Sequence, residues 1–139
     1  MGQVIVDISM ENYVDRMLSQ EDRLPMESVR AHTMPALVDS GAVMLVLPQD
    51  VTEKLGLKPV RRAVVTYADE RKDERDVVAP VYLTVAGRSM ATEALVGPPL
   101  SEALVGQIVL EALDLLVDCQ RQTLTPHPDS PIYPSLKMK

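Results

Sequence analysis

Short aliphatic runs separated by turn residues constrain this fold more than any other feature of the chain. There is no Phe or Trp and only four Tyr among 139 residues, so Val, Leu, Ile, Ala and Met must build the core. Gly and Pro repeatedly break these runs, a pattern that favours strands over long helices. The length suits one domain with a real hydrophobic core. We therefore expect a single, mostly β domain.

Charge and cysteine content argue against several classes of partner. The formal net charge is −6 and the pI about 4.8, so we expect no nucleic-acid partner. No apolar stretch could span a bilayer and residues 1–6 lack a basic segment, so we expect neither a membrane partner nor a signal peptide. Cys119 is the only cysteine, which fits a reducing, cytoplasmic location. With this one Cys and only two His, His32 and His127, no metal-ligand spacing appears, so we expect no metal site and no cofactor.

The apolar pattern predicts a succession of strands with few helices. One short helix is expected at 48–56 and another at 107–113, while 11–25 reads as an exposed excursion or a short helix. A Pro-rich tail, 127–139, follows the predicted domain, 1–126. Strands or apolar strand-like runs are expected at 4–8, 29–33, 36–38, 43–47, 62–67, 76–85, 90–96, 103–106, 115–117 and 122–124.

A polar tripeptide interrupts one of the apolar runs. Asp39, Ser40 and Gly41 lie between Leu37-Val38 and the run that begins at Val43. In one interpretation Asp39 is an ordinary turn residue whose carboxylate bonds nearby amides, and the tripeptide alone favours this interpretation. In the other, Asp39 carries chemistry, because a half-buried carboxylate costs free energy unless it is paired, hydrogen-bonded or protonated.

The chemical interpretation needs two carboxylates. Two Asp side chains held together cannot both ionise, so they share one proton and can act as base and acid on a water and a peptide carbonyl. The chain has one Asp-Ser-Gly and no Asp-Thr-Gly, so the second Asp would come from another copy related by a two-fold axis. An internal repeat adds weak support. Ala-Leu-Val occurs at 36–38, before the Asp39 turn and a predicted helix, and again at 103–105, before Gly106 and a predicted helix.

The ordered set of motifs resembles that of retropepsin-like aspartic proteases, in particular small single-domain prokaryotic relatives of retroviral proteases. Residues 36–42 match the active-site motif, in which two apolar residues precede Asp, Thr or Ser, Gly and Ala. The second signature is apolar-apolar-Gly before a helix, and Leu104, Val105 and Gly106 match it. Residues 64–69 resemble the rising arm of the flap, and the resemblance covers about 4–126.

The resemblance implies a closed acid-protease barrel with one or two short helices that acts as a homodimer. Asp39 would be the catalytic residue of an endopeptidase, and its substrate would be a peptide or unfolded protein. Ser40, Gly41 and Ala42 would form the active-site turn. The flap would close over substrate with four residues: Thr66, Tyr67, Ala68 and Asp69.

A second function remains open for the same fold. The predicted flap tip, 68–73, contains no Gly and several charges, which would also suit a catalytically silent module for peptide binding or dimerisation. Loss of cleavage in Asp39→Asn would favour the protease, and binding that persists without cleavage by the wild type would favour the module.

Overall fold

The computed structural model describes residues 3–138, which form mostly strands together with a few short helices. The predicted domain and tail also include residues 1–2 and 139, which lie outside the described residues. The elements, in chain order, are β1 (Ile5–Asn12), α1 (Tyr13–Gln20), the 3-10 turn η1 (Met26–Ser28), β2 (Ala31–Val38), β3 (Val46–Pro48), α2 (Gln49–Lys54), β4 (Lys58–Thr66), β5 (Lys72–Val85), β6 (Arg88–Gly97), β7 (Ala103–Val105), α3 (Gln107–Ala112), β8 (Leu115–Asp118) and β9 (Thr123–Pro126).

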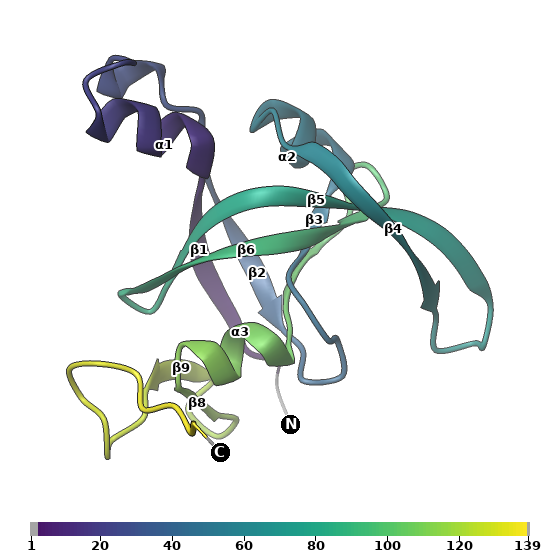
Figure 1. Ribbon diagram of the computed structural model, residues 1–139. Helices are drawn as coiled ribbons and strands as arrows, with labels where there is room; N and C mark the ends of the chain where they lie inside the picture. The colour runs from purple at the N-terminus through teal and green to yellow at the C-terminus, as the bar shows by residue number, and fades with distance from the viewer. Residues whose placement is uncertain (1–2, 139) are drawn as a thin grey trace.

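Six strands close into a barrel, as the sequence predicts. They follow the order β1-β2-β7-β3-β6-β5, and pairing of β5 with β1 completes the ring. Alternate side chains of these strands point inward and form an aliphatic core, in which Ile8, Leu47, Val81 and Leu83 are fully buried. The mostly β, retropepsin-like barrel expected from the sequence is therefore confirmed (Figure 1).

The hairpin formed by β4 and β5 extends beyond the barrel. β5 pairs with β4 from Lys72 to Ala79 and with β1 from Val81 to Val85, so one long strand belongs to both structures. Figure 1 shows the tip of this hairpin directed toward the same side of the view as the loop between β2 and β3. The hairpin is longer than the predicted 62–85, because β4 begins at Lys58.

β2 corrects the expectation that a strand ends at Thr33 before Pro35. One continuous strand runs through Pro35 to Val38. The amide of Val38 donates to the carbonyl of Val4, so alternate residues direct their N–H toward β1 and the nitrogen of Pro35 points away from it. β7 begins to pair only at Ala36, so the missing N–H of Pro35 interrupts no ladder.

The segment after β1 resolves the choice left open for 11–25. Asn12 caps α1 by accepting a hydrogen bond from the Asp15 amide, and its side-chain amide donates to the carbonyl of Leu55 beyond α2. Asp15 is buried and forms an ion pair with Arg30, which precedes β2. These contacts hold α1 against the end of the barrel away from the β2–β3 loop (Figure 1).

The chain past β9 contacts the barrel through its first residues. β9 ends at Pro126, where the domain boundary was predicted, and Ser130 beyond it is buried. The division into domain and tail stays a prediction. Within residues 3–138, no helix has the length and apolar character needed to cross a bilayer.

Candidate active site

The two Ala-Leu-Val runs of the internal repeat lie side by side. β2 and β7 pair in parallel, with Ala36 opposite Ala103 and Val38 opposite Val105. Because the strands are parallel, the residues that follow them emerge at the same edge of the sheet. Asp39 and Gly106 are therefore neighbours, and the Asp39 amide donates to the carbonyl of Val105 at 3.0 Å.

Hydrogen bonds hold the turn that contains Asp39. The Ala42 amide donates to the Asp39 carbonyl at 3.1 Å, and the Gly41 amide donates to Asp39 Oδ1 at 2.9 Å. Asp39 is half-buried, while Ser40 and Gly41 are exposed. Oδ2 receives no donor within the described part of the chain, so the carboxylate keeps one oxygen for an external partner.

Gly106 lets the second motif approach the loop after Asp39. A Cβ on Gly106 would lie 2.5 Å from the Met44 carbonyl oxygen and 2.7 Å from that of Ala42. Side chains do not tolerate such distances, so this position accepts only Gly without a backbone shift. Leu104 and Val105 hold the strand in place, since Val105 is fully buried and Leu104 pairs with Val46 of β3.

The beginning of α3 completes the site, and the sequence did not identify this contact. The Gln107 amide donates to the Ala42 carbonyl at 2.8 Å, and the Ile108 amide donates to the Val43 carbonyl at 2.9 Å. These are free N–H groups of the first helical turn, which need acceptors outside the helix. The apolar-apolar-Gly pattern indicated where α3 starts, but nothing local could indicate which carbonyls it meets.

The predicted flap residues lie at the tip of the β4–β5 hairpin. β4 ends at Thr66, and the Tyr67 amide donates to the Arg71 carbonyl to close the turn. Ala68 and Asp69 are exposed at its end. Glu70 adopts a left-handed conformation, with φ 67°, and so occupies the position at which a Gly was missing.

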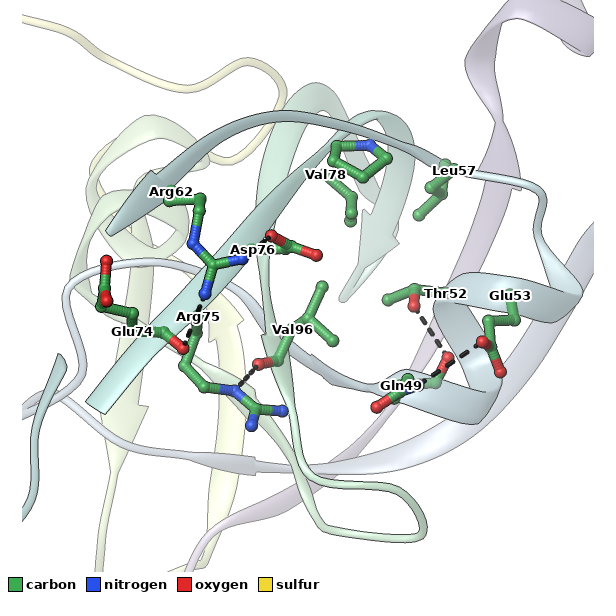
Figure 2. Close-up of a pocket in the computed structure, with 11 residues that line it drawn as sticks. Gln49, Thr52, Glu53, Leu57, Arg62, Glu74, Arg75, Asp76, Val78 and Val96 are labelled. Carbon is green, nitrogen blue, oxygen red and sulfur yellow. Dashed lines mark hydrogen bonds and ion pairs between the residues drawn. The ribbon is translucent and has the colours of Figure 1, made fainter. Parts of the chain in front are cut away.

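A separate pocket of about 370 Å³ lies at the base of this hairpin, between α2, β4, β5 and β6 (Figure 2). The Arg75 Nε donates to the Val96 carbonyl at 2.9 Å, and Arg62 forms an ion pair with Asp76. None of the predicted site residues lines this pocket. The structure thus brings the Asp39 turn and the Gly106 motif together, and places the flap tip on a projecting arm outside that contact.

The chemistry available at the contact of the two motifs is that of a carboxylate. Among residues 3–138, His, Cys, Asp and Glu side chains nowhere gather in threes as ligands for a metal ion. The Asp39 carboxylate could accept a proton or a hydrogen bond, and both peptide segments beside it are fixed by main-chain hydrogen bonds. Catalysis by a pair of carboxylates would need a second Asp beside it.

Comparison with known proteins places this geometry in a family. A family model described as aspartyl protease matches residues 28–110, more than half of the chain. The matched region includes the Asp39 turn, the whole β4–β5 hairpin and the Gly106 motif with most of α3. No curated protein matches the chain.

Proposed function

Because the chain belongs to the aspartyl protease family, we propose that it is an endopeptidase that hydrolyses peptide bonds as a homodimer. Asp39 from each protomer would form the catalytic pair. The observation that carries this proposal is the position of Asp39, half-buried in a turn that β7 and α3 fix by main-chain hydrogen bonds.

Exposed apolar residues around the turn support a second copy as the partner. Val43 is 65% exposed, Ile108 is 46% exposed, and the Ile108 amide is bonded to the Val43 carbonyl. Ile5 is 55% exposed and lies opposite Leu37, two residues before Asp39. Contiguous exposed apolar surface marks protein–protein interfaces, and we propose that these three residues form an apolar rim of that kind. A two-fold axis through it would bring each Asp39 to its equivalent.

In the proposed mechanism the two Asp39 carboxyls share one proton. The ionised carboxylate takes a proton from a water molecule as that water attacks the scissile carbonyl carbon. The protonated carboxyl donates a hydrogen bond to the developing oxyanion. When the carbon–nitrogen bond breaks, the carboxyl that received the water's proton delivers it to the leaving amine. That carboxyl is then ionised again, and the pair once more shares one proton. Ser40 would join the two turns through its hydroxyl.

The flap supports a peptide as the substrate. An extended peptide can hydrogen-bond to the main chain of a hairpin, which gives affinity with little dependence on sequence. The tip around Tyr67 would cover the peptide and exclude water from the carboxyl pair. The left-handed Glu70 supplies the turn geometry that this tip needs without a Gly.

Asp39→Asn tests the proposal. The wild type should cleave an unfolded protein between acid and neutral pH, and Asp39→Asn should reduce the rate by at least about a thousandfold, because an amide cannot take the proton. Asp22→Asn is the matched control, since Asp22 is exposed in the turn after α1. Cleavage that survives in Asp39→Asn would refute the assignment. A wild type that binds peptide at all pH values without cleaving it would favour the silent module.

A further inference from the structure

α3 depends on contacts at both of its ends. It has six residues, from Gln107 to Ala112, and so short a helix is not stable by itself in water. At its beginning, two amides hold the loop that follows Asp39, as described above. Whatever fixes the other end of α3 therefore also fixes the position of these amides.

A buried cation holds the end of α3. Arg88, at the start of β6, is 7% exposed, and its Nη1 donates to the carbonyls of Leu113 and Asp114 at 2.8 and 3.1 Å. These carbonyls follow the last turn of α3 and receive no N–H donor from within the helix, so a cation there is favourable. Arg88 Nη2 donates to the carbonyl of Ser130, which joins the C-terminal segment to the same point.

The C-terminal segment also binds the side chain of Asp114. The Ser130 hydroxyl donates to Asp114 Oδ2, and the Ser135 amide donates to the same oxygen at 3.0 Å. The hydrogen bond from Ser130 is the main reason that the pKa of the Asp114 carboxyl lies below its usual value, followed by that from Ser135. The His127 amide donates to the Asp114 carbonyl at 3.0 Å. Three residues of the segment thus converge on one residue.

We propose that residues 127–135 form a clasp on Asp114 that positions α3, and through α3 the Asp39 turn, for catalysis. Asp114 and Ser130 are positioning residues, because they act through α3 and do not touch the reacting atoms. The catalytic part of this inference rests on the proposed function. The structural part, which links the clasp to the amides of Gln107 and Ile108, does not.

Ser130→Ala and Ser135→Ala make a matched pair for testing the clasp. Both remove one hydroxyl from the same segment, but Ser135 contributes only its backbone amide. Ser130→Ala should therefore raise hydrogen exchange at the Gln107 and Ile108 amides about tenfold, whereas Ser135→Ala should change it less than about twofold. The barrel amides of Val81 and Leu83 serve as the internal reference in both variants, and their exchange should not change.

Activity gives the second measurement. Ser130→Ala should lower kcat about fivefold and change KM less than about twofold, because substrate contacts remain while the carboxyl geometry loosens. If the wild type shows no cleavage, the proposed function fails, and the exchange experiment still decides whether the clasp exists. If Ser130→Ala does not fold, Asp114→Gly replaces it with the same expected local exchange, because Gly removes the accepting oxygen and tolerates the positive φ of 52° at this position. Equal exchange in the test and control variants, or a uniform rise through the barrel, would overturn the proposal.

Discussion

Glycine positions differ in what an added methyl group would meet. At Gly106 the neighbours are backbone atoms of Ala42 and Met44, which cannot move without moving the Asp39 loop. At Gly97 the nearest atom is the Ser101 hydroxyl oxygen, 2.9 Å away at the end of a side chain that can rotate. A Cβ at Gly106 would therefore disturb the backbone of the candidate site, whereas a Cβ at Gly97 would mainly meet a side chain in a loop.

Gly106→Ala should lower the free energy of unfolding by about 2–3 kcal/mol, because the Cβ forces the loop and α3 apart. Gly97→Ala should cost less than about 1 kcal/mol, because a rotamer change of Ser101 makes room. Urea unfolding of both variants measures the difference. An equal cost at the two positions would mean that the loop around Ala42 yields easily and does not define the site.

At the scale of elements, local patterns predicted the strands well and their continuity poorly. Alternation of apolar and polar residues predicted the β4–β5 hairpin, β6 and the β8–β9 pair. The positions of Pro48 and Gly56 predicted α2. Pro35 wrongly divided β2, because only the tertiary neighbours show that its nitrogen faces no partner. The contact of α3 with the Ala42 and Val43 carbonyls joins residues more than sixty positions apart, and no local pattern encodes it.

The β4–β5 hairpin contains a residue in a strained conformation. Glu70 has φ 67°, and a non-Gly residue in the left-handed region costs about 1–2 kcal/mol. Glu70→Gly should therefore keep the hairpin and raise the free energy of unfolding by about 0.5–1 kcal/mol, after the entropy lost by Gly is subtracted. Thermal unfolding with Glu70→Ala as the control measures this. A Gly variant no more stable than the Ala variant would show that the tip is not held in this turn.

The ion pair between Asp15 and Arg30 joins α1 to the start of β2. Arg30 Nε and Nη2 donate to the two carboxylate oxygens at 2.8 and 3.0 Å. The side-chain hydrogen bond from Arg30 lowers the pKa of Asp15 below its usual value, despite an opposing contribution from burial. A lowered pKa in the folded state contributes stability above the unfolded pKa, about 3.9, and this stability is lost as the pH falls through the folded value.

Asp15→Asn should destabilise the protein by about 1–2 kcal/mol at pH 7, a range that allows for the half-exposed Arg30 side chain. The difference from the wild type should begin to shrink below about pH 4, where the unfolded carboxylate takes up a proton, and should shrink further as the pH falls through the lowered folded pKa. Urea unfolding across this pH range measures both, with exposed Asp22→Asn as the control. A difference that stays constant down to the lowest pH would show that the ion pair does not stabilise α1.

At the scale of the whole molecule, the sequence indicated a barrel, a family and one catalytic carboxylate per chain. The family model and the closed ring of strands confirm the first two. The catalytic role of that carboxylate stays a proposal, because it depends on a second Asp39 from another subunit, and the structure contains one chain. The apolar rim of Ile5, Val43 and Ile108 gives the proposed dimer a surface. These residues lie far apart in sequence, and only the fold places Ile5 opposite Leu37 and Ile108 beside Val43.

Mixing the wild type with Asp39→Asn tests the shared carboxyl pair most directly. If the two chains are refolded together in equal amounts, about a quarter of the dimers carry both Asp39 side chains. Activity per wild-type chain should then fall to about half that of the wild type alone, because a mixed dimer has only one carboxyl. Activity per wild-type chain that does not change on mixing would contradict a site shared between two subunits.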